Sequence, residues 1–210
     1  MCNIAARDVA SRVGGSGDAG VIVGVLLAAG GARRFGSQKL IAMLDGVPIV
    51  RRAADALTSV TDMTVIVVGS ESTAVREAVA ETGALVVENT AWANGLASSL
   101  RCGVVAVPAR ASAAIVALGD QPQMDAVVLR SLIDRWRETG SPIVTARYRG
   151  ERGHPVLFDR SVFAELAGLE GDAGAKGLIE QSPERVAYVD VDADVPRDVD
   201  TPDDLAALGG

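Results

Sequence analysis

Residues 21–39 read VIVGVLLAAGGARRFGSQK, an apolar run that leads directly into a segment rich in glycine and in cationic side chains. The apolar part, 21–29, is about half as long as a membrane-spanning helix. It is rich in valine and leucine, so it predicts a buried strand. Open α/β sheets bind ligands at the carboxyl ends of their strands. The stretch therefore favours an α/β fold and marks 30–39 as a candidate binding loop.

Outward from this stretch, short apolar runs alternate with helical patterns, as is typical of an α/β protein with a mostly parallel sheet. We expect further strands at 64–68, 84–87, 113–118, 143–146, 155–158 and 186–191. Helices are expected at 48–57, 71–82, 95–107 and 125–139. Three further helices are expected: one that begins at 161, a short one that ends at 181, and one that begins at 201. Asp125 and Thr201 are candidate N-caps, and Gly140 is a candidate helix stop. We interpret 21–210 as a single domain and 1–20 as a flexible extension.

The composition excludes several classes of protein. The 27 acidic and 20 basic side chains give a net charge of −7, which argues against a protein that grips a nucleic-acid backbone. Cys2 and Cys102 are too few for a thiolate metal cluster, and nothing indicates a disulfide framework. Residues 1–20 lack the apolar core of a signal peptide. We therefore expect a reduced chain in the cytoplasm.

Three residues belong to types that are scarce in this chain. There is one histidine, His154, and there are two lysines, Lys39 and Lys176, against eighteen arginines. A zinc site with two histidine ligands is excluded, and a Ser-His-Asp triad would have to use His154. Compositional bias explains why lysine is rare, but it does not explain why both lysines fall in the motifs described below.

The segment 30–39 has the glycines and cations of a phosphate-binding loop without matching either common motif. Gly31 and Gly36 have the spacing of a P-loop, but the Lys-Ser/Thr pair that should follow is missing, and no G-x-G-x-x-G is present. Glycines let backbone N–H groups approach a polyphosphate, and Arg34 and Lys39 add positive charge. The alternative is an ordinary glycine turn with solvated arginines.

Two acidic residues lie where a divalent cation could be held. Asp120 follows the predicted strand at 113–118, and Asp200 precedes the predicted carboxyl-terminal helix, with Asp198 as a further candidate. Mg²⁺ prefers oxygen ligands and often takes one or two carboxylates together with substrate phosphates. The alternatives are a Gly-Asp-x-Pro turn for Asp120 and helix capping for Asp200.

These segments, in this order, resemble the nucleoside-triphosphate transferases that activate sugars, alcohols and molybdopterin, and the molybdenum cofactor cytidylyltransferases in particular. The matching segments are LAAGGARRFGSQK at 27–39, GLASSL at 95–100, GDQP at 119–122, GHPVLF and LEGDAGAK at 153–158 and 169–176, and DVDTPDDL at 198–205. Two positions depart from the family pattern, with Ala32 in place of Ser and Lys176 in place of Arg. The resemblance implies a three-layer Rossmann-like fold of the nucleotide-diphospho-sugar transferase type, with a mostly parallel mixed sheet.

The resemblance also implies a role for individual residues. Nucleotide binding is implied for Leu27, Ala28, Ala29, Gly30, Gly31, Arg34, Lys39, Gly95, Ser98, Ser99 and Asp120, of which Arg34, Lys39 and Asp120 are implied to be catalytic. Acceptor binding is implied for Gln121, Pro122, His154, Asp172, Gly174 and Lys176. Asp120 and Asp200 would hold Mg²⁺.

The activity implied by the resemblance is transfer of CMP from CTP, the co-substrate, to the terminal phosphate of molybdopterin, with Mg²⁺ as cofactor and pyrophosphate as product. Ala29 favours cytosine over guanine, because the guanylyltransferase relatives have Leu-Ala-Gly-Gly. Three alternatives stay open: a guanylyltransferase that uses GTP, an NAD(P)H-dependent oxidoreductase of the nicotine blue oxidoreductase type, and a non-catalytic molybdenum cofactor chaperone.

The expected partners are small molecules, namely a nucleoside triphosphate and molybdopterin. A molybdenum hydroxylase is a candidate client. We expect no nucleic acid and no membrane as partners, and a monomer or a weak dimer.

Overall fold

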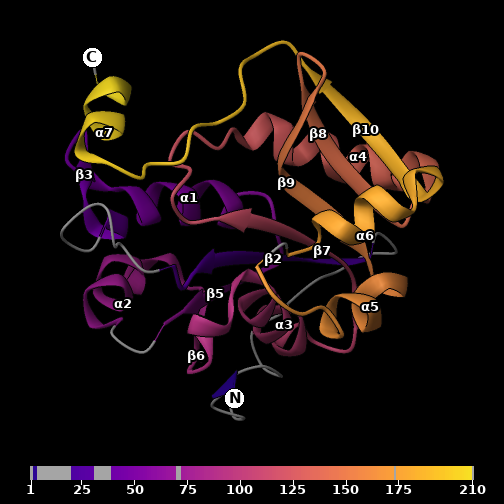
Figure 1. Ribbon diagram of the computed structural model, residues 1–210, viewed down its shortest axis with the longest axis horizontal. Coiled ribbons are helices and arrows are strands. Elements are labelled where there is room, and N and C mark those ends of the chain that lie inside the picture. Colours follow the sequence, from indigo (N-terminus) through magenta and orange to yellow (C-terminus); the bar gives the residue numbers. More distant parts are fainter. Residues whose placement is uncertain (1, 4–19, 31–38, 70–71, 173, 210) are drawn as a thin grey trace.

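The computed structural model describes residues 2–3, 20–30, 39–69, 72–172 and 174–209. Its centre is an eight-stranded sheet with the strand order β1-β6-β5-β2-β7-β9-β8-β10 (Figure 1). The strands are β1 (Cys2–Asn3), β2 (Val21–Ala28), β5 (Met63–Val68), β6 (Leu85–Asn89), β7 (Ala111–Leu118), β8 (Ile143–Tyr148), β9 (Glu151–Asp159) and β10 (Val186–Val191). Strands β3 (Met43–Leu44) and β4 (Val47–Pro48) form a separate hairpin.

Helices connect most of these strands. They are α1 (Ile49–Thr58), α2 (Thr73–Val79), α3 (Leu96–Ala106), α4 (Ala126–Thr139), α5 (Phe163–Ala167), α6 (Lys176–Gln181) and α7 (Pro202–Leu208). Short 3-10 turns are η1 (Lys39–Ile41), η2 (Ala80–Thr82), η3 (Trp92–Asn94), η4 (Arg160–Val162) and η5 (Pro183–Arg185). Within the described ranges, no helix has the length and apolar character needed to cross a membrane.

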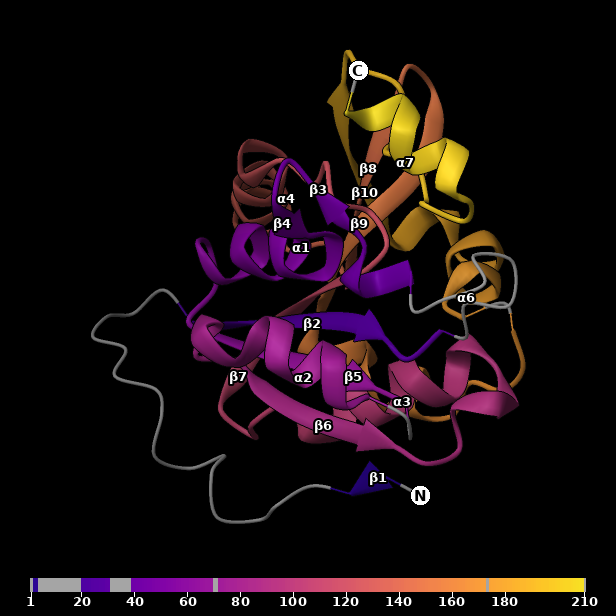
Figure 2. The same cartoon turned by 90° about the vertical axis from the view of Figure 1, so that its left-hand side faces the viewer.

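Strand β2 shows why the molecule has three layers. Its odd-numbered side chains from Val23 to Leu27 pack in one core cluster with α3, α5 and α6. Its side chains Ile22, Leu26 and Ala28 pack in a second cluster with α1, α2 and α4. Because successive side chains of a strand point to opposite faces, both faces of β2 are buried under helices (Figure 2). The expected three-layer α/β fold is confirmed.

The sheet combines a parallel part with an antiparallel part. Strands β6, β5, β2 and β7 run parallel to one another, and β8 runs parallel to β10. Strand β9 is antiparallel to both β7 and β8, and β1 is antiparallel to β6. The mostly parallel mixed sheet is thereby confirmed. Strand β9 begins at Glu151, earlier than expected, because its charged first residues form an exposed hairpin with the end of β8.

The predicted helix ends agree with the structure, with one exception. The Asp125 carboxylate accepts a hydrogen bond from Val127 N at 2.7 Å and caps α4, which stops at Gly140 with a left-handed φ of 61°. Thr201 caps α7. The helix predicted at 71–82 is shorter, because its last turn tightens into η2 before the left-handed Gly83.

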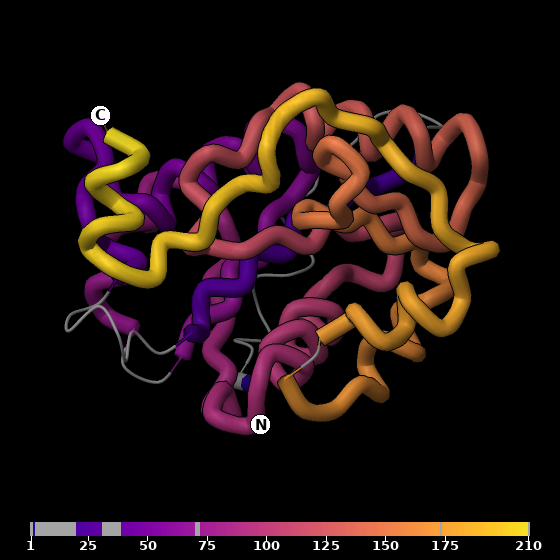
Figure 3. The backbone as a smooth tube through the Cα atoms, turned by 45° about the horizontal axis from the view of Figure 1, so that its top comes forward, coloured from indigo at the N-terminus to yellow at the C-terminus, as the bar shows by residue number. Residues whose placement is uncertain are grey.

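The carboxyl-terminal segment returns across the molecule to the first half of the chain. From the end of β10 it runs to α7, which lies beside α1 and the β3–β4 hairpin (Figure 3). Val199 is fully buried and packs in one cluster with Leu44 and Ile49. Its backbone N–H donates to the carbonyl of Asp120 at 3.0 Å. This return brings the last sequence motif next to the loop that follows β7.

The first residues of the chain correct two expectations. Cys2–Asn3 pair with β6 as the edge strand β1, so this part of 1–20 is not a flexible extension. Cys2 is disulfide-bonded to Cys102 of α3, with 5.4 Å between the Cα atoms, whereas we expected two reduced cysteines. The partners are 100 residues apart, and only the edge pairing of β1 brings them together. Residues 4–19 lie outside the described part of the chain.

Candidate active site

The carboxyl ends of β2 and β7 lie side by side and carry two of the predicted motifs. The strands are parallel, with Leu27 paired to Leu118. Gly119 N donates to the Leu27 carbonyl at 2.9 Å, which fixes the start of the Gly-Asp-Gln-Pro segment beside the end of β2. Asp120 therefore stands beside Ala28, Ala29 and Gly30, as the sheet topology predicts. Gly31 and Arg34 lie outside the described residues.

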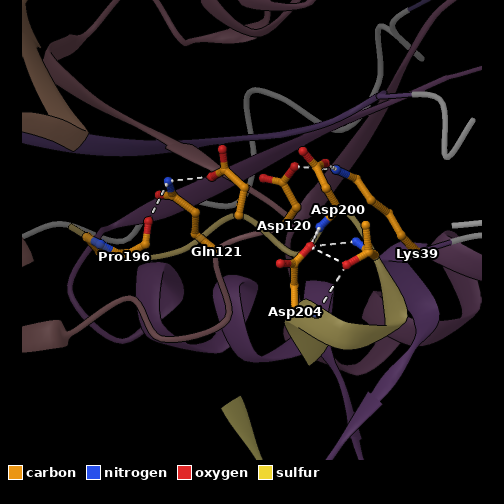
Figure 4. A network of polar contacts seen from close by, with 8 residues as sticks. Lys39, Asp120, Gln121, Pro196, Asp200 and Asp204 are labelled. Carbon is orange, nitrogen blue, oxygen red and sulfur yellow. Dashed lines mark hydrogen bonds and ion pairs between the residues drawn. The ribbon is translucent and has the colours of Figure 1, made fainter. Parts of the chain in front are cut away.

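Lys39 bridges two of the predicted acidic residues. Its Nζ lies 2.7 Å from Asp120 Oδ2 and 2.8 Å from Asp200 Oδ1 (Figure 4). The Lys39 side chain is 10% exposed, against 22% for Asp120 and 48% for Asp200. Burial on its own would lower the pKa of Lys39, but the charges and hydrogen bonds of the two carboxylates outweigh it, so the pKa is raised. The ammonium stays charged.

Asp200 is positioned by the cap of α7. Asp204 Oδ2 accepts hydrogen bonds from the backbone N–H groups of Asp200 and Thr201 and from the Thr201 hydroxyl. Hydrogen bonds from Thr201 lower the pKa of Asp204, which keeps this cap ionised. The capping interpretation of 198–205 is correct for Thr201 and Asp204. The Asp200 side chain itself faces Lys39.

Gln121 ties the Asp120 loop to the carboxyl-terminal segment. Its Nε2 donates to Asp198 Oδ1 at 2.8 Å and to the Pro196 carbonyl at 3.4 Å (Figure 4). Burial raises the pKa of Asp198, the nearby Asp120 and Asp200 carboxylates raise it further, and the bond from Gln121 opposes them only in part. Gln121, which the resemblance places on the acceptor side, is thus buried in a structural contact.

The acidic pair has the donor set of a hard divalent cation. Asp120 and Asp200 present carboxylate oxygens to the same point, where they already hold a cationic group. In the part of the chain that is described, no group of three or more His, Cys, Asp or Glu residues is arranged as a metal site. A pair of carboxylates is the kind of site that often holds Mg²⁺ together with substrate phosphates.

A cavity of about 440 Å³ opens beside this acidic pair. Its lining includes six residues expected to contact the nucleotide in addition to Lys39 and Asp120: Leu27, Ala28, Ala29, Gly30, Gly95 and Ser99. It also includes residues that were not expected to bind the nucleotide, among them Leu40, Trp92 and Leu96. We call it the first cavity.

A buried polar network holds the start of α3 against the first cavity. Asn89 Nδ2 donates to the hydroxyls of Ser98 and Ser99, and Asn89 Oδ1 accepts from Ala91 N. The Ser98 hydroxyl donates to the Gly95 and Ala91 carbonyls. Ser98 is therefore fully used in positioning the helix, whereas Ser99 reaches the cavity wall.

Gly95 joins the first cavity to the segment 171–172. Its φ of 96° is left-handed, and a Cβ at this position would overlap the Asp172 carboxylate and the Gly171 carbonyl. The same carbonyl accepts a hydrogen bond from Ala97 N at 3.1 Å. Asp172, assigned by resemblance to the acceptor side, therefore lines the first cavity.

A second cavity of about 300 Å³ adjoins the first and shares Leu27 and Leu96 with it. Three residues expected on the acceptor side line it, namely His154, Gly174 and Lys176. The remaining lining is mostly apolar, apart from Thr145 and Arg152, which the motifs did not indicate. Pro122 is buried and lines neither cavity.

His154 has an unusual environment in the second cavity. Its Nδ1 is buried, with no hydrogen-bond partner among the described residues. Burial lowers the pKa of His154, and a hydrogen bond with the Val116 backbone opposes this only in part, so the imidazole is neutral at pH 7. By contrast, the Lys176 side chain is 72% exposed and lies 4.0 Å from Glu180.

The geometry agrees with the family comparison. The model of the MobA-like NTP transferase domain matches residues 24–186. The chain belongs to this family. The resemblance carried by the sequence motifs is thereby confirmed, and the chain has a nucleotidyltransferase-like domain of a family that acts on small molecules.

Relatives share this domain over nearly their whole length. The nicotine blue oxidoreductase of Paenarthrobacter nicotinovorans is 31% identical over 205 residues, which cover 92% of this chain and 99% of the relative. The crystal structure of Rv0371c from Mycobacterium tuberculosis H37Rv has a TM-score of 0.79 at 35% identity and covers 90% of this chain and 97% of that chain. A structure of Rv0371C in complex with manganese has a TM-score of 0.76 at the same identity and the same two coverages.

A more distant structure confirms the fold. A nucleotidyl transferase from Methanothermobacter thermautotroptrophicus has a TM-score of 0.74 at 22% identity and covers 90% of this chain and 95% of that chain.

Proposed function

We propose that this protein transfers CMP from CTP to the terminal phosphate of molybdopterin in a Mg²⁺-dependent reaction that releases pyrophosphate. One observation carries the proposal: Lys39 and Asp120 of the Asp120–Lys39–Asp200 bridge line a cavity that adjoins a second one. Two adjoining cavities suit two substrates that react with each other. The bridge supplies the charged groups that a triphosphate requires.

In the proposed reaction, an oxygen of the acceptor phosphate forms a bond to the α-phosphorus of CTP, and the bond from that phosphorus to the pyrophosphate oxygen breaks. The attacking oxygen is already ionised near neutral pH, so no general base is needed. Bound Mg²⁺ would neutralise phosphate charge and align the reacting groups. Asp120 and Asp200 are the residues that would hold it, and the Lys39 ammonium would stabilise charge on the leaving pyrophosphate.

The residues that line the two cavities suit different substrates. The first cavity has the residues after β2 and the start of α3, which suit the nucleotide. The second cavity suits the acceptor, because its apolar wall can cover a planar ring system while Arg152 and Lys176 provide cations for a phosphate. His154 is placed to hydrogen-bond a polar ring edge, because its buried Nδ1 has no hydrogen-bond partner within the described part of the chain. Ala29 supports the choice of cytosine.

We further propose that residues 21–210 act as one domain and that the protein works as a monomer or a weak dimer. The domain proposal is supported by the origin of the site: Lys39 and Asp200 come from opposite ends of this range.

Pyrophosphate release measures the reaction directly. The purified chain is incubated with Mg²⁺, molybdopterin and either CTP or GTP. We expect release with CTP and at least tenfold less with GTP. Thermal shift with NADPH, run in parallel, is expected to show no stabilisation.

The same assay separates the alternatives. Equal or greater release with GTP would assign a guanylyltransferase. Stabilisation by NADPH with no pyrophosphate from either nucleotide would reject the transferase and favour the oxidoreductase. Tight molybdopterin binding without turnover would favour the chaperone.

A further inference from the structure

The Lys39 ammonium occupies the point where the carboxylates of Asp120 and Asp200 converge. It touches one oxygen of each, at 2.7 and 2.8 Å. A divalent cation held by the same two carboxylates would take oxygens at about 2.1 Å. A metal that bridges the same two oxygens would take the position of the ammonium, so the two could not be present there together.

The charges around this point explain why a cation must always occupy it. Asp198 is close enough for the charges of Asp120 and Asp200 to act on it. With Lys39 removed and nothing in its place, the partly buried Asp120 and the half-exposed Asp200 would face each other without the cationic group that both now contact. Like charges in such surroundings strongly disfavour ionisation. Lys39 thus supplies the positive charge when the metal is absent.

We propose that Lys39 and the divalent cation exchange at the Asp120–Asp200 pair. In the free protein Lys39 closes the metal position, and it moves to the polyphosphate when the nucleotide arrives together with its metal. The inference rests on the proposed function, because the polyphosphate is what draws Lys39 away. Lys39 lines the first cavity and has a flexible four-carbon stem, so the exchange requires only a change in its side chain.

The exchange predicts weak metal binding in the absence of nucleotide and mutual strengthening when both are present. Such coupling is reciprocal, because each ligand raises the affinity of the other by the same factor.

Mn²⁺ binding measured by electron paramagnetic resonance tests the exchange without any turnover. In the absence of nucleotide we expect Lys39→Met to bind Mn²⁺ at least tenfold more tightly than the wild-type chain. Arg130 is exposed on α4 and lines neither cavity, and Arg130→Met removes the same charge. It is expected to change the affinity less than twofold. Adding Asp120→Asn to Lys39→Met should abolish the gain.

A second measurement uses the wild-type chain and does not depend on a variant that folds. The two lysines give a ¹⁵N-lysine ammonium spectrum with at most two side-chain signals, assigned by comparison with Lys176→Arg. We expect saturating Mg²⁺ without nucleotide to shift or remove the Lys39 signal. A Lys39 signal that stays unchanged while Mg²⁺ is bound would falsify the exchange.

The inference and the proposed function fail in different ways. If Lys39→Met binds Mn²⁺ no more tightly than wild type, the exchange is rejected, even in a chain that releases pyrophosphate. If the variant gains affinity but the wild-type chain releases no pyrophosphate from either nucleotide, the exchange is supported and the transferase is rejected.

Discussion

The two cavities use polar groups in opposite ways. In the first, Lys39, Asp120 and Asp200 satisfy one another, and Asp204 and Gln121 hold their segments in place. In the second, the buried Nδ1 of His154 finds no hydrogen-bond partner among the residues that the structure describes, and the rest of the wall is mostly apolar. A preorganised charged network is suited to neutralising a reacting polyphosphate. An unsatisfied polar atom in an apolar wall is suited to selecting a ligand that completes it.

This difference predicts the largest effect for Asp120→Asn. We expect turnover to fall by about 10²–10³-fold, because the variant removes a charge that acts on the reacting phosphates. Acceptor affinity, which depends on the second cavity, should change less than twofold. Pyrophosphate release gives the first quantity, and calorimetric titration with molybdopterin gives the second. Asp203→Asn is the matched control, because Asp203 is exposed in the first turn of α7 and should leave turnover unchanged. Full turnover in the Asp120 variant would remove the metal role.

Gly95→Ala tests the contact between Gly95, at the start of α3, and the segment 171–172. The left-handed φ and the overlap with the Gly171 carbonyl and the Asp172 carboxylate should cost about 3 kcal/mol of unfolding free energy. Gly140→Ala is the control, because Gly140 has a φ of 61° with open space around it. It should cost about 1 kcal/mol. Chemical denaturation measures both. Equal losses of unfolding free energy in the two variants would show that segment 171–172 moves away from the added Cβ at no measurable cost.

The unfolding free energy depends on pH through His154, the only histidine of the chain, which lines the second cavity. Because the pKa of His154 is lowered in the folded protein, the unfolded chain takes up the proton first as pH falls below about 6.5. The contribution of His154 is thus fully present above that pH and is lost below it. We expect wild type to lose about 1 kcal/mol more unfolding free energy than His154→Gln between pH 7.5 and 5.5. Parallel pH profiles of the two proteins would contradict this.

The smallest effect is expected at Lys176. Lys176→Arg provides a planar fork that can bind a phosphate in a bidentate manner. Acceptor affinity should rise about threefold with no change in nucleotide affinity, since a single exposed charge-assisted contact contributes little more. Titration with each substrate separately distinguishes the two effects. A change in nucleotide affinity would contradict the assignment of Lys176 to acceptor binding.

Much of the fold can be predicted from the sequence, because the signals are local. Buried parallel strands such as β2 and β5 are continuous apolar runs, and caps such as Asp125 and Thr201 act within one turn. Strand β1 has two residues and no such signal. Its disulfide depends on a pairing between distant segments, so cysteine spacing does not reveal it.

The site is less accessible to sequence reasoning, because its residues are brought together by the path of the chain. The motifs indicate Lys39, Asp120 and Asp200 separately, but their mutual ion pairs follow only from the return of the carboxyl-terminal segment. The motifs also do not distinguish a residue that lines a cavity from its neighbour. Ser99 lines the first cavity, whereas the Ser98 hydroxyl is used in hydrogen bonds that position α3. Asp172 lines the first cavity because its segment packs against Gly95.

The contrast between the two lysines has a practical consequence for labelling. Reagents that acylate amines need an accessible, unprotonated nitrogen. Lys39 is buried, ion-paired and held in its charged form, whereas the Lys176 side chain is mostly exposed. One lysine side chain would therefore carry the dye, at the first residue of α6 and on the wall of the second cavity. The folded protein thus offers a selective attachment point for a fluorescent reporter of acceptor binding, without an engineered cysteine.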